Sequence, residues 1–257
     1  MIDPVPSRIH DLNQHSCINV SFALSGKQLP ADHGYLLYSA VSKSSSALHG
    51  IDWLGIELIS GFPSGRGLIS LAERGASLHL RIPAEHYRDV LPLAGKRLDI
   101  SSHQIRLGLP LARPLEPAPS LYARVVTIKK FTEPEPFLEA IKRKLDQFGI
   151  RGRVELPCDV AQTASLRSAD NRKVETQNSK FDFRYRRRIV TIHGKLVVGF
   201  SVAVHDLNDE DSLLLQAGAV KVTSPEDGSV RWQSIFSRRA MGCGIFNPIL
   251  NASTSEE

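Results

Sequence analysis

The order of hydrophobic patterns along this 257-residue chain predicts an α+β protein built from two similar halves. Residues 17–108 read as strand, helix, short strands, helix and strand, and a similar order recurs in residues 121–246. Between them, residues 110–119 contain four prolines, which disfavour a helix or a central strand and are typical of a semi-rigid linker. We therefore predict two tandem ferredoxin-like β-α-β-β-α-β domains, residues 1–116 and 117–257, joined by a proline-rich linker.

The first half supplies each element of this pattern. Apolar residues alternate with polar ones in residues 17–25, which indicates a strand, and Asp32 is a favourable N-cap for a helix that runs toward Leu48. Glycine-bearing turns then separate β-like runs, and Pro83 opens a second helix. We expect the helix in residues 83–91 and strands in residues 55–59, 67–71, 77–82, 96–100 and 104–108.

The second half repeats the order. A strand at residues 121–129 precedes an amphipathic helix at residues 134–148, which Gly149 ends. Residues 181–205 are a strong hairpin candidate, since two apolar runs flank the turn at residues 193–195. We expect the remaining elements to be a short strand at 154–156, a helix at 209–216 and a last strand at 244–246.

Composition narrows the class of protein. The 32 Lys and Arg residues exceed the 27 Asp and Glu residues by five, which allows a nucleic-acid partner without requiring one. The three cysteines lie far apart and form no Cys-x-x-Cys pair, so we predict neither a disulfide framework nor a structural zinc site. No export signal or membrane-spanning run is evident, and we predict a cytoplasmic protein without cofactor or membrane partner.

Two basic segments in the second half point to a nucleic acid. One is the loop in residues 237–246, where Arg238 and Arg239 precede Gly242 and Gly244, a spacing that suits close approach to an anion but also an ordinary turn or bulge. The other spans residues 167–195, where aromatic residues alternate with positive charge, as in sites that stack unpaired bases. Its alternative is a strand edge made basic against aggregation. The residues predicted to contact RNA are Arg172, Lys173, Arg184, Arg186, Arg187, Arg188, Arg238, Arg239, Gly242 and Gly244.

Two histidines flank the first predicted helix. Cleavage of a phosphodiester without a metal needs a group that exchanges a proton near neutral pH, and His33 and His49 are the candidates, each with capping or packing as its alternative. The hydroxyls of Tyr38 and Ser42 lie on the same helix and could orient a phosphate. No His-x-x-x-His pair or carboxylate cluster suggests a metal site.

Four segments together resemble the Cas6 family of CRISPR-associated endoribonucleases, and more narrowly its myxan-type branch. They lie at residues 29–38, 92–98, 121–134 and 238–246, and the resemblance runs from about residue 18 to 248. It implies two ferredoxin-like (RRM-like) domains and metal-independent cleavage of precursor CRISPR RNA, in which a ribose 2′-hydroxyl attacks the adjacent phosphorus. The implied products carry 2′,3′-cyclic phosphate and 5′-hydroxyl ends, and the repeat hairpin is expected to stay bound.

The resemblance also ranks the site residues. The position of His49 matches the family's catalytic histidine, with His33 as the second candidate, Tyr38 and Ser42 as assistants and Lys43 to offset charge on the phosphate. The glycine-rich loop matches the family's RNA-contacting loop. Residues 159–179 and 221–236 depart from the family pattern; they could contact RNA, contact other subunits, or form loops without fixed structure.

Two other functions compete with this one. The first is a non-catalytic subunit that binds the 3′ hairpin of CRISPR RNA within an effector or transposon-associated complex. The second is a ferredoxin-like protein that binds small molecules, against which the basic segment at residues 167–195 argues.

Overall fold

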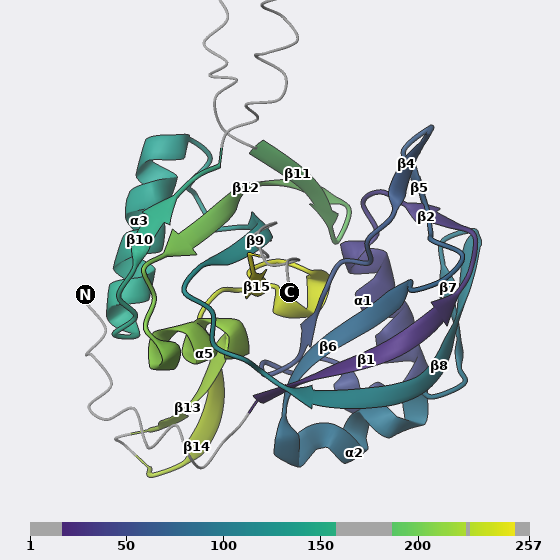
Figure 1. Cartoon of the computed structure of the whole chain (residues 1–257), viewed down its shortest axis with the longest axis horizontal. Helices are drawn as coiled ribbons and strands as arrows, with labels where there is room; N and C mark the ends of the chain where they lie inside the picture. The colour runs from purple at the N-terminus through teal and green to yellow at the C-terminus, as the bar shows by residue number, and fades with distance from the viewer. Residues whose placement is uncertain (1–16, 158–186, 225–226, 250–257) are drawn as a thin grey trace, which may run out of the picture.

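The structure is a computed structural model that describes residues 17–157, 187–224 and 227–249 (Figure 1). It is a mixed α+β fold in which the strand pairs of the sheets are antiparallel. Two five-stranded sheets, each covered on one face by helices, account for the two halves of the molecule. Within the described part of the chain, no helix has the length and apolar character needed to cross a membrane.

The first sheet has β1 (Cys17–Ser25) at its centre. Its strand order is β3 (Gly55–Ile56), β6 (Ser77–Pro83), β1, β8 (His103–Pro114) and β7 (Arg97–Ile100). Alternation along β1 sends Val20 and Phe22 into a core with Leu37 and Val41 of α1 (Gly34–Ser44), because successive side chains of a strand point to opposite faces. The predicted second helix is three short pieces: η3 (Ala84–His86), α2 (Tyr87–Val90) and η4 (Leu91–Leu93).

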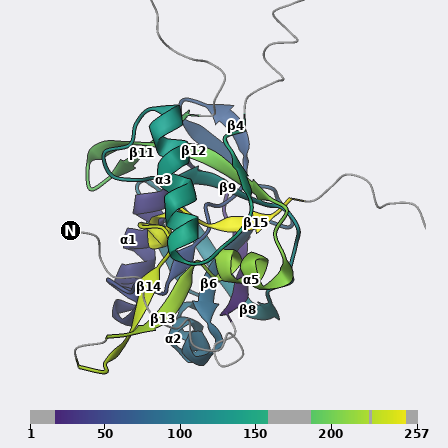
Figure 2. The same ribbon diagram turned by 90° about the vertical axis from the view of Figure 1, so that its left-hand side faces the viewer.

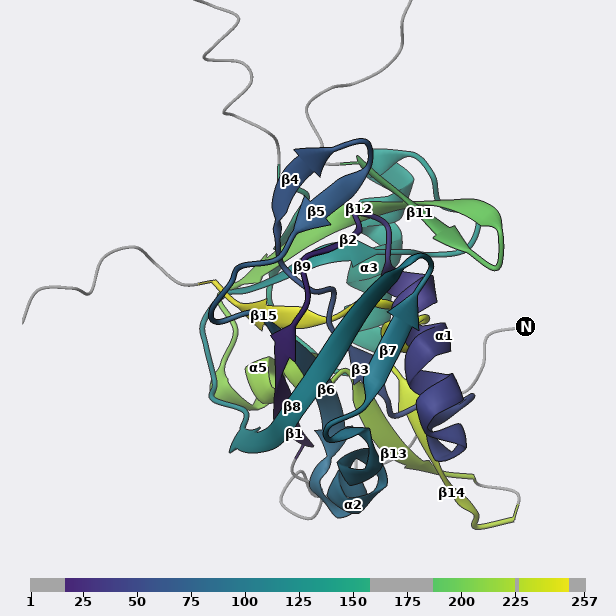
Figure 3. The same ribbon diagram turned by 90° about the vertical axis from the view of Figure 1, so that its right-hand side faces the viewer.

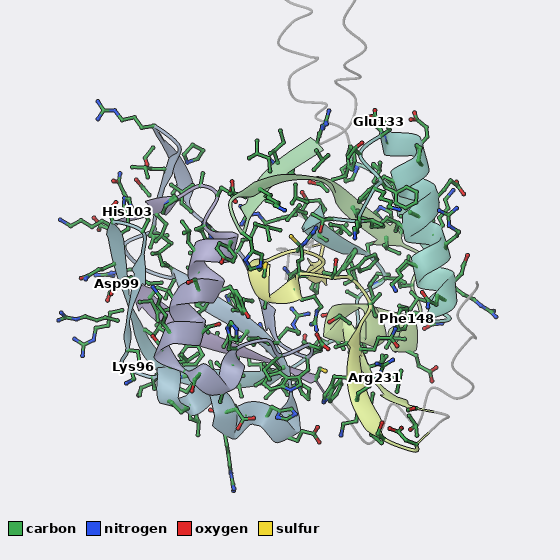
Figure 4. The ribbon with its side chains drawn as sticks, turned by 180° about the vertical axis from the view of Figure 1, so that it is seen from behind. Lys96, Asp99, His103, Glu133, Phe148 and Arg231 are labelled. Carbon is green, nitrogen blue, oxygen red and sulfur yellow. The ribbon has the colours of Figure 1, made fainter. Side chains whose placement is uncertain are left out.

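The second sheet has the order β10 (Arg153–Glu155), β12 (Lys195–His205), β9 (Leu121–Val126) and β15 (Phe246–Pro248), with β11 (Arg187–Ile192) also paired to β12. Its core includes Phe137 and Ile141 of α3 (Pro134–Gln147) and Leu215 of α5 (Asp209–Ala217). Glu133 and Phe148, labelled in Figure 4, mark the two ends of α3. The predicted hairpin is confirmed for residues 187–205.

The proline-rich segment is only partly a linker. Strand β8 continues to Pro114 and pairs with β1, with Pro110 opposite Phe22 and Pro114 opposite Ile18. Strand β7 pairs with residues 103–106 of β8, so among the described residues the later part of β8 has a neighbouring strand, β1, on one side only. A proline lacks a backbone N–H donor and is tolerated where a strand has no neighbour on that side. Residues 110–114 are therefore strand, and the linker begins after Pro114 instead of at Pro110.

Two small sheets were not predicted. One has the order β2 (Gln28–Pro30), β5 (Leu68–Ser70) and β4 (Phe62–Gly65), although residues 61–65 were expected to be a turn. The other is the hairpin of β13 (Ala219–Thr223) and β14 (Val230–Ser234). This hairpin occupies most of residues 221–236, and Trp232 packs against the core of the first half.

Candidate catalytic site and RNA-binding surface

Helix α1 begins at a buried histidine. The ring of His33 is fully buried, with Nδ1 2.8 Å from the Pro30 carbonyl oxygen and Nε2 3.0 Å from the Ile59 backbone nitrogen. A carbonyl can only accept and an N–H can only donate, so Nδ1 carries the proton and the ring is neutral. Burial lowers the pKa of His33. With both nitrogens engaged inside the protein, His33 joins β2 and the Ile59 segment to the start of α1, a structural role.

The other histidine lies at the far end of α1. Helix α1 is followed by the short helix η2 (Ser46–Leu48), whose buried Leu48 anchors the chain and leaves His49 exposed. The Tyr38 hydroxyl is 3.5 Å from Nδ1 of His49, and the two rings stack with centroids 6.0 Å apart. Gly50 N–H donates to the same hydroxyl at 3.0 Å, so the hydroxyl proton is available to His49.

The remaining residues predicted to assist catalysis lie on the last turn of α1. Lys43 is exposed there. The Ser42 hydroxyl oxygen is buried and has no hydrogen-bond partner among the described residues. The structure therefore brings Tyr38 and His49 together. Ser42 and Lys43 lie on the same stretch of chain, but within the described part of the protein neither forms a hydrogen bond with His49.

Arg239 is buried between the two halves. Its side chain is 2% exposed and donates from Nη1 to the Trp53 carbonyl at 3.2 Å and from Nη2 to the Ala217 carbonyl. Burial lowers its pKa to about 10, so the guanidinium still carries its charge at neutral pH. The prediction that Arg239 contacts RNA directly disagrees with this geometry, because its donors are turned inward onto protein carbonyls.

The two glycines of the same loop are also buried. At Gly242, where φ is 81°, a Cβ atom would overlap the Leu58 side chain; at Gly244, where φ is 64°, it would lie 2.5 Å from Cβ of Phe236. Gly244 N–H donates to the Val125 carbonyl at 2.8 Å. The glycines are thus explained by positive φ and close packing rather than by the predicted contact with RNA. Burial also raises the pKa of Cys243, between them, to about 11, which keeps this thiol protonated.

Three of the predicted RNA-binding arginines remain accessible. Arg187 and Arg188 are exposed at the start of β11. Arg238 is half-buried and donates to the Thr127 hydroxyl at 3.1 Å. Four further predicted contacts lie outside the described residues: Arg172, Lys173, Arg184 and Arg186.

The basic hairpin, formed by β11 and β12, contacts the start of helix α1. Thr191 N–H of β11 donates to a carboxylate oxygen of Asp32 at 2.6 Å. At the hairpin turn, the centroid of the His193 ring lies 4.6 Å from the centroid of the Tyr35 ring. Figure 1 shows the tip of this hairpin reaching across to the start of α1. The sequence predicts a helix cap at Asp32 and a turn at His193, but the contact between these two distant segments could not be predicted from either local pattern.

A second buried arginine, Arg81 of β6, joins the two halves and was not predicted from the sequence. It is 4% exposed and donates to the carbonyls of Gln216, at 2.7 Å, and Phe246, at 3.2 Å, and to Oδ1 of Asn247 at 2.9 Å. Its signal in the sequence was weak, because Arg81 continues the polar positions Ser77 and His79 of an alternating strand, a pattern typical of a surface charge. Within the described residues, no group of three or more His, Cys, Asp or Glu side chains is placed to hold a metal ion.

Comparison with known proteins agrees with the resemblance. The family described as "Cas6 Crispr" matches residues 18–251. The CRISPR-associated endonuclease Cas6 of Myxococcus xanthus (strain DK1622) is 33% identical over 231 residues, which are 90% of this chain and 81% of that protein.

Solved structures show a similar fold at low sequence identity. A CRISPR-associated protein Cas6 has a TM-score of 0.56 at 12% identity, covering 91% of this chain and 100% of that one. A structure described as a Cas6-related gene from Pyrococcus furiosus has a TM-score of 0.53 at 12% identity, covering 91% and 98%. Together with the sequence match over nearly its whole length, this establishes that the chain belongs to the Cas6 family.

Proposed function

We propose that this protein is a repeat-specific endoribonuclease that cleaves precursor CRISPR RNA without a metal ion. The observation that carries the proposal is the pairing of exposed His49 with buried Tyr38 at the end of α1. An imidazole can take or give a proton near neutral pH, and an aligned hydroxyl at one ring nitrogen leaves the other free for substrate. The family membership and the relative named as an endonuclease support this activity.

The proposed reaction is an internal transesterification. The ribose 2′-hydroxyl loses its proton and attacks the adjacent phosphorus, while the bond from phosphorus to the 5′-oxygen breaks and that oxygen takes up a proton. The products are a 2′,3′-cyclic phosphate and a 5′-hydroxyl. His49 serves one of the two proton transfers, Tyr38 orients its ring, and Lys43 offsets the negative charge that builds on the phosphate.

The RNA-binding surface that we propose follows the basic hairpin. Arg187 and Arg188 are exposed on β11, and this strand is fixed to the start of α1 by the Thr191–Asp32 hydrogen bond. One RNA could therefore contact β11 while its backbone passes along α1. We assign the same role to Arg238 and to the basic residues Arg172, Lys173, Arg184 and Arg186. Neutralisation of each phosphate makes the affinity more dependent on salt.

We also propose that the two halves are tandem ferredoxin-like domains, with the boundary near residue 117. The four strands of the unit are β1, β3, β6 and β8 in the first half and β9, β10, β12 and β15 in the second. In both sheets their spatial order is second, third, first, fourth: β3-β6-β1-β8 and β10-β12-β9-β15. The identical order in both sheets supports duplication of one β-α-β-β-α-β unit. Strands β2, β7 and β11 and the hairpins β4–β5 and β13–β14 are then additions to that unit.

Cleavage of the repeat RNA from the protein's own CRISPR array tests the function. In EDTA we expect one cut, abolished by a 2′-deoxy sugar at the scissile position, because DNA-like sugar has no attacking hydroxyl. His49→Ala should slow single-turnover cleavage by about a hundred- to ten-thousandfold. Tyr38→Phe should slow it by about fivefold, since a neutral hydrogen bond contributes about 1 kcal/mol.

His103→Ala is the matched control. His103 is the first residue of β8, next to the turn from β7 (Figure 4), and within the described residues it forms no hydrogen bond or ring contact with the Tyr38–His49 pair, so its removal should leave the rate unchanged. Full-length RNA that stays bound but uncut would contradict the proposal and favour the alternative, a non-catalytic subunit that holds the 3′ hairpin. Loss of all cutting in EDTA, restored by a divalent ion, would contradict metal independence.

A further inference from the structure

The small sheet β2-β5-β4 presents one row of side chains across three strands. Gln28 and Phe62 both lie opposite Ser70 of the central strand β5, so the three residues share a face. The Gln28 amide nitrogen is 3.4 Å from the hydroxyls of both Ser70 and Ser64. Beside these polar groups, the Phe62 ring is 70% exposed.

The opposite face of the sheet is packed against the protein. Leu29 and Ile69 are paired across β2 and β5; Leu29 is fully buried, and Ile69 packs against the core of the first half. These contacts fix the backbone of the sheet. The exposure of Phe62 is therefore a property of an anchored surface and not of a free loop.

The composition of this surface suits a nucleic acid. The segments that form it, residues 26–31 and 61–71, contain Lys27 and Arg66 and no acidic residue. Arg66 stands at the tip of the β4–β5 hairpin between Gly65 and Gly67, and all three residues have positive φ. An exposed ring stacks on a base, an amide side chain reads the polar edge of that base, and a cation at the tip neutralises a phosphate.

The sheet is joined directly to the proposed catalytic helix. His33, the residue before α1, bonds to Pro30 at the end of β2 and to Ile59 on the way into β4. Figures 2 and 3 show the β4–β5 hairpin at the same end of the molecule as the β11–β12 hairpin. An RNA that contacts β11 and follows α1 therefore passes next to the sheet β2-β5-β4.

We propose that the sheet β2-β5-β4 is a second RNA subsite, which binds an unpaired base of the repeat outside its hairpin. Phe62 stacks on the base, Gln28 recognises its edge, and Arg66 contacts the phosphate. The inference rests on the proposed function, because it assumes that the substrate is a repeat RNA with single-stranded flanks. It adds a site that selects for the sequence beside the hairpin.

Binding of two RNAs to the full chain tests the subsite. One is the repeat with both single-stranded flanks and the other is its hairpin alone, each with a 2′-deoxy sugar at the scissile position. The wild type should bind the flanked RNA more tightly. Phe62→Ala should weaken that binding by about fivefold or more and leave the hairpin unaffected, whereas Phe62→Trp should retain it, since stacking does not require a particular ring.

Two further variants divide the roles. Gln28→Ala should remove the preference among flanks that differ in one base, and Arg66→Ala should lower the salt dependence of binding by about 0.7 in the log–log slope. Leu109→Ala is the control, because Leu109 is 82% exposed on β8 and lies outside the small sheet. Thermal unfolding of each variant checks that it is folded.

The outcomes separate this subsite from the enzyme's activity. If the wild type cuts the repeat but Phe62→Ala binds the flanked RNA within twofold of the wild type, the subsite is wrong and the proposed function stands. Unchanged RNA binding with loss of self-association in Phe62→Ala would assign the surface to protein contact instead. If the wild type neither binds nor cuts the repeat, both proposals fail.

Discussion

The two histidines that flank helix α1 show how surroundings decide the role of a residue. His33 has both ring nitrogens bonded to backbone groups in a dry environment, whereas His49 is exposed and has a hydroxyl near only one nitrogen. The same side chain is thus a fixed, neutral connector at one end of the helix and available for proton exchange at the other. The sequence alone could not assign these roles, because one histidine directly precedes the helix and the other follows it by a few residues.

The buried His33 ring predicts a dependence of stability on pH. Its pKa is lowered in the folded protein, so the unfolded chain binds more protons. Its contribution to stability is complete above the ordinary pKa of 6.5 and is lost as the pH falls below that value, by up to about 1.4 kcal/mol per pH unit. Unfolding in denaturant at pH 5.0–7.5 measures this effect.

His33→Asn separates this effect from that of the other histidines. It should be less stable than the wild type at pH 7.5, because Asn cannot bridge Pro30 and Ile59 as the ring does. It should also lose less stability on acidification, since the buried titrating group is gone. Parallel pH profiles for the two proteins would show that His33 does not contribute.

At the scale of elements, the loop in residues 237–246 is the clearest example of an element whose sequence had two interpretations. Its arginines and glycines were read as an anion-binding loop, with an ordinary turn as the alternative. In the structure the short helix η5 (Arg239–Met241) lies against α1 and β3, and its flanking glycines allow close contact with Leu58 and Phe236. The loop packs against α1 and helps to hold this helix in place.

Two glycine substitutions test this packing. Gly242 and Gly228 both have positive φ, 81° and 69°. A Cβ atom at Gly242 would overlap Leu58, whereas one at Gly228 would meet no atom of the described residues within 4 Å. Alanine costs roughly 1–2 kcal/mol at each for the backbone conformation. Gly242→Ala should be less stable than Gly228→Ala by about 1–3 kcal/mol for overpacking.

The double variant Gly242→Ala, Leu58→Ala should recover part of this difference, because it removes the clash. Chemical denaturation of the four proteins measures the effect. Equal losses in the two single variants would mean that the loop is not closely packed.

Sequence periodicity was sufficient for the long elements. The strand at 17–25, the helix at 134–147 and the hairpin at 187–205 have strong alternation or an amphipathic face, and they are confirmed. It failed at two places. Residues 61–65 were expected to be a turn because of their glycines, but residues 62–65 form β4 and pair with the neighbouring strand β5. The end of β8 was expected to be a linker because of its prolines, but it pairs with β1, which is distant in sequence.

The candidate site also contains parts that the sequence could predict and parts that it could not. The neighbourhood of Tyr38 and His49 could be predicted because the two residues lie within one helical segment. The buried arginines could not, because they bind carbonyls of residues distant in sequence: Arg81 and Gln216 are 135 positions apart, and Arg239 and Trp53 are 186 positions apart.

At the scale of the molecule, two buried arginines connect the halves through one helix end. Arg81 of β6 donates to the Gln216 carbonyl and Arg239 donates to the Ala217 carbonyl, at the last residues of α5. The carboxyl end of a helix carries partial negative charge and unpaired carbonyls, so cations are favourable there. Arg239 also donates to Trp53 of the first half, and Lys221 of the β13–β14 hairpin pairs with Glu85 at 3.0 Å. The halves are thus fixed relative to each other.

Arg239→Met should loosen this connection. It leaves the carbonyls of Trp53 and Ala217 without their donor, each at a cost of about 1–3 kcal/mol, which is partly offset because a buried charge is removed. Thermal and chemical unfolding should show lower stability. The control is Arg231→Met, at an exposed position of β14 (Figure 4), which should have the same stability as the wild type. Equal stability of the two variants would refute the bridging role of Arg239.

The position of Arg81 in the chain has a consequence for synthesis. Arg81 lies on β6 of the first half, but its three acceptors belong to Gln216, Phe246 and Asn247, which are made 135, 165 and 166 residues later. Because the N-terminal part of a nascent chain generally folds first, we expect the first half to keep this guanidinium hydrated until these acceptors emerge and the second half folds around it. Synthesis of residues 216–247, rather than folding of the first half, is then the event that fixes the two halves in their final relative geometry.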